Sequence, residues 1–113
     1  MNIFKKIWYS ERFMTEDQKI VNTTLRDVTE WIEKEKTPPD LDSFCVKTKT
    51  IDKRLLQDII RAHSKYLRVE NGILRPTYYG IQFNKKGGFC IGYYVKHVLT
   101  LKFIFQQTKY LVA

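Results

Sequence analysis

Apolar residues recur every three or four positions between residues 15 and 36. This spacing joins Val21, Leu25, Val28 and Ile32. Side chains at such intervals lie on one side of an α-helix, because the helix turns once every 3.6 residues. We therefore expect a helix over residues 15–36 that packs one side against a core.

Both ends of this helix carry boundary signals. Thr15 followed by Gln18 has the form of a capping box, in which each side chain accepts an amide N–H from the other residue. Pro38 and Pro39 follow the helix, and proline cannot donate a backbone hydrogen bond. The pattern therefore predicts a helix that begins after Thr15 and ends before Pro38.

Two further helices are expected before residue 66. Leu41 and Phe44 form a short apolar side after Asp40, which predicts a helix of about two turns over residues 41–47. Thr50 can cap a longer helix that ends near Lys65. The apolar positions of this third helix are Ile51, Leu55, Leu56, Ile59 and Ile60.

A hairpin is expected over residues 66–77. Asn71-Gly72 separates two short apolar runs, and both residues tolerate the positive φ of a two-residue turn. Thr77 can then cap a brief helical turn, which the glycines at 87 and 88 would close.

The first and third helices each have a single apolar side, so each needs a partner to cover it. We expect these sides to meet in one core together with the helical turn after the hairpin. Its expected members are Leu25, Val28, Leu55, Ile59 and Phe83.

Residues 89–105 are apolar almost all round a helix, which is favoured here over a pair of strands. So much apolar surface needs cover. We expect residues 90–113 to form an oligomerisation element, with an interface that includes Val95, Leu99 and Phe103. The N-terminal arm, residues 1–14, can pack against it. Contact with a membrane surface, aided by the nearby lysines, is a less favoured alternative.

Charge is uneven along the chain. The formal net charge is +8, from twenty Lys and Arg against twelve Asp and Glu. Residues 37–113 hold thirteen of the basic residues and only five of the acidic ones. Such an excess favours an acidic partner, either nucleic acid or a membrane surface.

Signals for catalysis, metals and export are missing from the sequence. The two cysteines form no CxxC pair, and the two histidines lack ligand spacing. No Ser-His-Asp arrangement or phosphate-binding glycine loop is present, so we expect neither an enzyme nor a cofactor. The N-terminus has no signal-peptide core, which predicts a cytoplasmic protein with reduced thiols.

The order of helix, short helix, turn, basic helix and hairpin resembles a winged helix-turn-helix over residues 15–89. Residues 75–83 look like the "strand, Thr, two residues, Gly" element after the wing of many bacterial regulators. Residues 83–89 resemble small winged-helix-like proteins of Bacteroidetes and their phages. The resemblance implies a mostly helical α+β fold with a short β-hairpin wing, and a homodimeric transcription regulator that binds double-stranded DNA.

The third helix carries the candidate DNA-binding residues. Side chains four residues apart share a face, and Arg and Gln can read bases while Lys anchors phosphates. The basic and polar candidates in and before this helix are Lys47, Lys49, Thr50, Lys53, Arg54, Gln57 and Arg61. The same pattern also fits an ordinary solvated helix, and Asp58 lies beside this face.

The hairpin tip favours a different function. It reads Glu70-Asn71-Gly72, with no Arg or Lys to enter a minor groove. The alternative is a winged-helix-like interaction module whose apolar C-terminal segment docks on a protein partner or a membrane surface.

Overall fold

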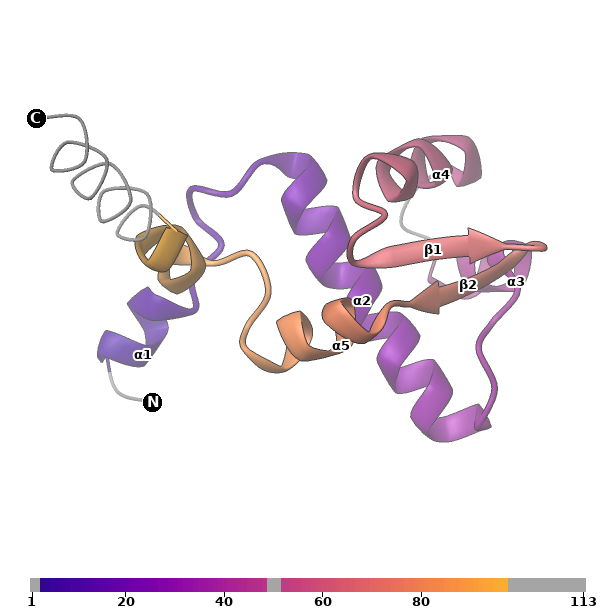
Figure 1. The fold of residues 1–113 in the computed structure, drawn as a ribbon, viewed down its shortest axis with the longest axis horizontal. Coiled ribbons are helices and arrows are strands. Elements are labelled where there is room, and N and C mark those ends of the chain that lie inside the picture. Colours follow the sequence, from indigo (N-terminus) through magenta and orange to yellow (C-terminus); the bar gives the residue numbers. More distant parts are fainter. Residues whose placement is uncertain (1–2, 49–51, 98–113) are drawn as a thin grey trace, which may run out of the picture. The chain divides into compact units, whose positions relative to one another are not determined.

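The computed structural model describes residues 3–48 and 52–97 of the 113-residue chain. The chain divides into two compact units (Figure 1). One unit is Thr15–Gly88, and the other combines Met1–Met14 with Phe89–Ala113.

Within the described residues the protein is a mostly helical α+β structure, with six helices and one antiparallel hairpin (Figure 1). The Thr15–Gly88 unit contains α2 (Glu16–Glu35), α3 (Leu41–Thr48), α4 (Lys53–Ala62), β1 (Leu67–Glu70), β2 (Ile73–Pro76) and α5 (Tyr78–Lys85). The other unit contains α1 (Ile3–Trp8) and a helical stretch at residues 91–97.

The predicted boundaries of the first long helix are confirmed by α2. The Thr15 hydroxyl accepts the Gln18 N–H at 3.1 Å, and the Gln18 side chain accepts the Thr15 N–H at 3.0 Å. At the other end Lys36 adopts φ 64°, a left-handed conformation that ends the helix before the two prolines. Local chemistry therefore determines where α2 begins and ends.

The short helix and the hairpin are also confirmed. The Asp40 carboxylate accepts the Ser43 N–H at 3.0 Å at the start of α3. Hydrogen bonding to Ser43 lowers the pKa of the Asp40 carboxyl. Asn71 and Gly72 have φ of 53° and 76°, as a two-residue hairpin turn requires. After the hairpin, the Thr77 hydroxyl accepts the Gly80 N–H at 2.9 Å and caps α5.

The third helix differs from its prediction in extent and in one buried residue. α4 ends at Ala62 rather than near Lys65, and Asp52 occupies its N-cap position. Thr50, the expected cap, lies outside the described residues. Leu55, which we expected in the core, is 50% exposed. The buried side of α4 is centred on Leu56 and its neighbours one turn on, and Leu55 is rotated about 100° away from Leu56.

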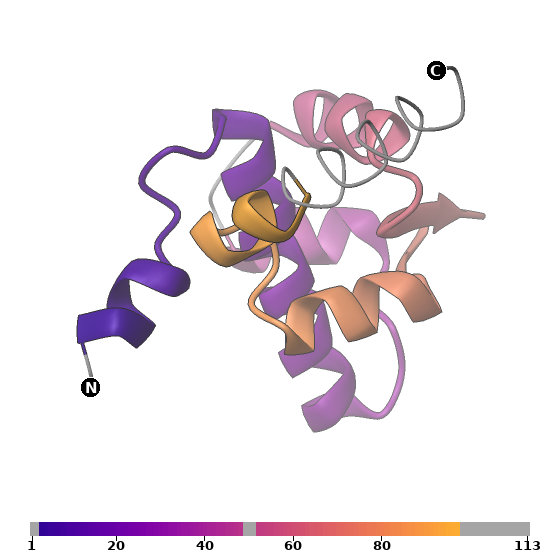
Figure 2. The ribbon, with the colours of Figure 1, turned by 60° about the vertical axis from the view of Figure 1, so that its left-hand side comes forward.

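The core of the Thr15–Gly88 unit forms around α2, which contacts α4, α5 and β2 (Figure 2). Its fully or almost fully buried apolar residues include Val21, Leu25, Val28, Leu41, Phe44, Leu56, Ile59, Ile60, Leu67, Leu74 and Phe83. Four of the five residues expected in the core are thus buried, with Leu55 as the exception.

In the other unit, the Ile91 N–H donates to the Ser10 carbonyl at 3.0 Å. The indole of Trp8 lies against Gly92, where any Cβ would overlap the ring. Helix, favoured for residues 89–105, is present at residues 91–97, and residues 98–105 lie outside the described part. No helix among the described residues is long and apolar enough to cross a membrane.

Candidate nucleic-acid interface

α4 separates its apolar and charged side chains onto opposite sides. Leu56, Ile59 and Ile60 are buried in the core. Arg54, Asp58 and Arg61 are exposed. They lie together on the opposite side, because residues three and four apart share a helix face. The outward side of α4 is therefore mainly basic, with one carboxylate between the two arginines.

Lys53 is directed toward Asp42 of α3. Its Nζ lies 2.5 Å from Oδ1 of Asp42, and both side chains remain largely exposed. The hydrogen bond that Lys53 donates to the Asp42 carboxylate raises the pKa of Lys53. Lys53 therefore shares its charge with Asp42, whereas Arg54 and Arg61 have no carboxylate within ion-pair distance among the described residues.

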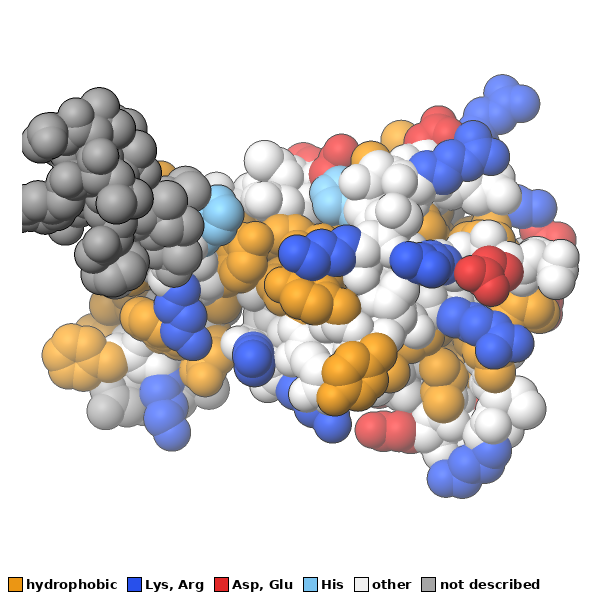
Figure 3. All heavy atoms as spheres, viewed as in Figure 1, with side chains coloured by type: hydrophobic (Ala, Val, Ile, Leu, Met, Phe, Trp, Pro, Cys, Tyr) orange, Lys and Arg blue, Asp and Glu red, His pale blue; other side chains and the backbone are white. Residues whose placement is uncertain are grey.

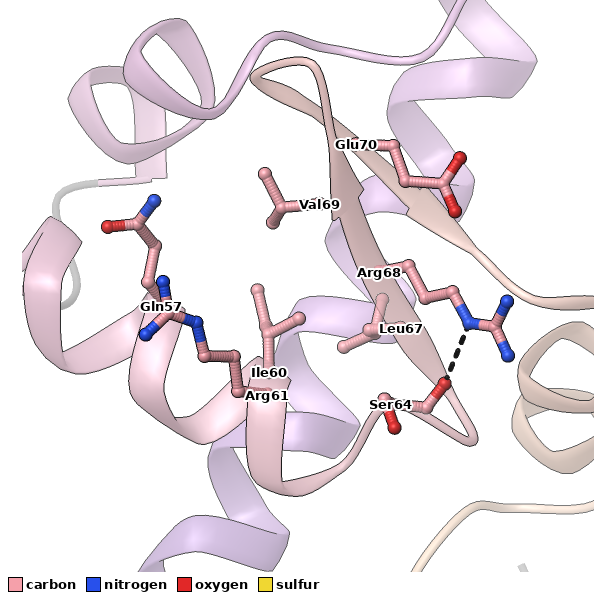
Figure 4. Close-up of a pocket in the computed structure, with 8 residues that line it drawn as sticks. All are labelled: Gln57, Ile60, Arg61, Ser64, Leu67, Arg68, Val69 and Glu70. Carbon is pink, nitrogen blue, oxygen red and sulfur yellow. Dashed lines mark hydrogen bonds between the residues drawn. The ribbon is translucent and has the colours of Figure 1, made fainter.

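A groove of about 250 Å³ separates α4 from β1 (Figure 4). Gln57 and Arg61 line its α4 side, and Val69 projects into it from β1 (Figure 4). The residues that line it are Gln57, Ile60, Arg61, Ser64, Leu67, Arg68, Val69 and Glu70. Two of the expected DNA-binding residues, Gln57 and Arg61, thus lie at a groove that faces the hairpin.

Lys47 belongs to a different surface. Its Nζ lies 4.6 Å from the centre of the Trp31 ring, a cation–π contact between α3 and α2. Asp27 and Glu30 line the same hollow. Burial of the Asp27 carboxyl raises its pKa, and the nearby negative charge of Glu30 adds a smaller effect in the same direction. Lys47 therefore lies against α2, beside the acidic residues Asp27 and Glu30. Lys49 and Thr50 lie outside the described residues.

The hairpin carries basic residues that the sequence interpretation overlooked. In the strand register Arg68 pairs with Arg75, and both are exposed. Figure 3 shows Lys and Arg side chains among apolar patches over α4, the hairpin and α5. A signal was available in the sequence, because residues 59–88 hold six Lys or Arg and one acidic residue, Glu70. The two-residue turn at Asn71-Gly72 also implies the Arg68–Arg75 pairing.

Of the proposed interface residues, Val95 is half-buried in the helical stretch 91–97. Leu99 and Phe103 lie outside the described part of the chain. In the same unit, large apolar side chains of α1 are exposed: Ile3 at 67%, Phe4 at 76% and Ile7 at 54%. This unit therefore presents apolar surface to its surroundings.

In residues 3–48 and 52–97, no group of three His, Cys, Asp or Glu side chains is arranged to hold a metal ion. Comparison of the chain with protein-family models, with curated proteins and with solved structures finds no match.

Proposed function

We propose that residues 15–89 form a winged helix-turn-helix domain that binds double-stranded DNA through α4. In this domain α3 and α4 are the helix pair, and β1 and β2 are the wing. The function is binding without catalysis, and its place is the cytoplasm. A regulator of transcription is the role that such a module would serve.

The backbone between α2 and α3 supports this topology. Asp40 forms an antiparallel bridge with Ile73 of β2. On either side of it, the Leu41 N–H donates to the Gly72 carbonyl at 2.8 Å, and the Leu74 N–H donates to the Pro39 carbonyl at 2.9 Å. A third extended segment thus lies beside the hairpin and joins the start of α3 to the wing.

The observation that carries the proposal is the side-chain distribution on α4. One side is fixed in the core, and the other exposes Arg54 and Arg61, of which Arg61 also lines the groove to the hairpin. A DNA major groove about 12 Å wide admits one helix presented in this way. Arginine bonds either phosphates or guanine, and the amide of Gln57 suits adenine.

A second copy would complete the DNA-binding unit. We propose a homodimer through the apolar C-terminal segment, with Val95, Leu99 and Phe103 in the interface. Two copies of α4 would then reach half-sites about one DNA turn, roughly 34 Å, apart.

The test is the salt dependence of binding to random-sequence duplex DNA, measured by fluorescence anisotropy. Replacing Arg54 and Arg61 together by Gln is expected to flatten the slope of log affinity against log salt by about 1.8, near 0.9 for each lost phosphate contact. The matched control replaces Arg26 and Lys34 of α2 by Gln, which removes the same charge from another surface. Equal slopes in the two double variants would remove α4 from the interface.

A second candidate function is favoured by the exposed apolar side chains of α1. Under this hypothesis, the unit that contains Ile3, Phe4 and Ile7 docks on a protein partner or on a membrane surface, and the helix pair serves only as a scaffold. Association of the chain with anionic vesicles, together with no affinity for duplex DNA at low salt, would favour it over the first function.

A further inference from the structure

The outer face of the hairpin holds two like charges in direct opposition. Arg68 of β1 is paired with Arg75 of β2, and side chains of directly opposed residues lie on the same face of a sheet. Like charges at opposed positions destabilise a strand pair. No ion pair joins either arginine to a carboxylate among the described residues. The hairpin therefore keeps two opposed positive charges that no ion pair compensates among the described residues.

This face borders the groove beside α4, because Arg68 and Glu70 also line that groove, but Arg75 is not among the groove's lining residues. In Figure 4 Val69 projects toward α4, whereas Arg68 and Glu70 extend from the other side of β1. The Arg68 Nε donates to the Ser64 carbonyl at 3.2 Å (Figure 4), which fixes Arg68 to the segment between α4 and β1. A ligand on this face would thus use side chains other than Arg54 and Gln57.

The two arginines border a hollow that also has an aromatic wall. Its volume is about 290 Å³. We call it the arginine–tyrosine hollow, and its lining residues are Arg68, Glu70, Arg75, Pro76, Thr77 and Tyr78. A base and a phosphate are both accommodated by groups of this kind, since guanidinium ions bind phosphate oxygens and aromatic rings stack on bases.

Tyr78 is the only one of the two neighbouring tyrosines whose ring is open within the described part of the chain. It is 79% exposed, and no described ring or cation lies against it. Tyr79, in contrast, has the Lys65 Nζ 4.3 Å from its ring centre and packs with Tyr66 at 5.5 Å between centres. The face of Tyr78 is therefore available to a ligand.

We propose that the arginine–tyrosine hollow binds single-stranded nucleic acid, with a phosphate held by Arg68 and Arg75 and an adjoining base stacked on Tyr78. The proposal rests on the proposed function in taking nucleic acid as the partner. It differs in the form bound, because the bases of a duplex are stacked inside the helix and cannot lie flat on a protein ring. Glu70, on the same face near the turn, repels phosphate and directs the strand toward Tyr78.

The experiment measures anisotropy of fluorescein-labelled oligothymidylate, and of oligouridylate in parallel, with the full-length protein. Arg75→Glu is expected to weaken the affinity for whichever of the two oligonucleotides binds by about tenfold or more. Because this change sets a carboxylate opposite Arg68, the melting temperature should not fall, and loss of binding cannot be attributed to unfolding. Lys34→Glu is the control, since it makes the same charge change on α2.

The aromatic part of the proposal has its own pair of variants. Tyr78→Ala is expected to weaken binding about 5- to 150-fold, the range found for loss of one base–aromatic stack. Tyr78→Phe keeps the ring and should bind within about twofold of the unchanged chain, by the same reasoning.

The outcomes separate this inference from the proposed function. Strand binding that is lost in Arg75→Glu and retained when Arg54 and Arg61 are replaced by Gln would support the arginine–tyrosine hollow, even if duplex binding were absent. Failure to bind either oligonucleotide at low salt would overturn it, as would equal affinities of Arg75→Glu and Lys34→Glu. Neither of these negative results would affect duplex binding by α4.

Discussion

Leu55 and Leu56 are neighbours in α4 with opposite environments. Leu56 is 1% exposed, whereas Leu55 is 50% exposed. Successive residues of a helix are rotated by about 100°. The buried side of α4 is centred on Leu56 and on the pair Ile59 and Ile60 one turn later, so Leu55 lies at its edge. The apolar pattern placed both on the inner side of the helix and named Leu55 for the core, because the pattern does not specify the direction from which the rest of the protein covers the helix.

This difference has a measurable consequence for stability. Leu56→Ala should lower the free energy of unfolding by about 2–5 kcal/mol, because it leaves a cavity in the core. Leu55→Ala, the matched control in the next position, should change it by no more than about 0.5 kcal/mol. Urea denaturation followed by circular dichroism distinguishes the two, and similar losses in both variants would contradict the orientation of α4.

At the scale of the elements, α5 is held against the start of the hairpin through Thr77 and Gly80. The Thr77 N–H donates to the Tyr66 carbonyl at 3.0 Å, and its hydroxyl donates to the Lys65 carbonyl at 2.6 Å. Gly80 is buried, and any Cβ there would overlap the backbone of Tyr66. The absence of a side chain at Gly80 therefore sets how closely α5 approaches the residues before β1.

A substitution that normally favours helices is expected to have the opposite effect here. Alanine is a better helix former than glycine by about 1 kcal/mol. Gly80→Ala should nevertheless lower the free energy of unfolding by about 1–3 kcal/mol, the usual cost of overpacking, because its Cβ would collide with a backbone carbonyl.

Lys85→Ala, at an exposed position of the same helix, is the control for that experiment and should stay within about 0.5 kcal/mol of the unchanged chain. Denaturant unfolding of both variants decides the matter. A Gly80→Ala chain as stable as the unchanged protein would mean that α5 does not approach Tyr66 so closely.

At the scale of the whole molecule, the two units differ in how their apolar residues are covered. In Thr15–Gly88 most large apolar side chains are buried around α2, with Val46, Leu55 and Tyr78 among the exposed exceptions. In the unit that contains α1, Ile3 and Phe4 are more than half exposed. Exposed apolar surface of this kind is typical of a region that meets a partner.

The proposed homodimer predicts how the chain behaves in solution. Light scattering should give a dimer at micromolar concentration, because a two-fold contact covers the same apolar patch on both copies. Val95→Asp should shift the equilibrium toward monomer, since it puts a carboxylate into the interface. Lys34→Asp, in the other unit, should leave the dimer intact. A soluble monomer at high micromolar concentration would contradict the dimer and with it paired half-sites on DNA.

The sequence by itself determined the course of the backbone in most of the described chain. The capping box at Thr15, the prolines after α2 and the Asn71-Gly72 turn act on residues within a few positions of themselves. Such short-range signals can be recognised from the sequence alone, because their hydrogen bonds and φ preferences need no distant partner. The Arg68–Arg75 pairing follows from the same turn.

Only the tertiary structure decided which side chains share a surface. Lys53, Gln57 and Arg61 recur at one spacing, yet Lys53 meets Asp42 of α3 while the other two line the groove to β1. Tyr78 likewise joins Arg68 and Arg75 around one hollow. These arrangements depend on how separate elements pack together. Contacts between residues distant in sequence establish that packing, and the periodicity within a single helix or strand does not encode it.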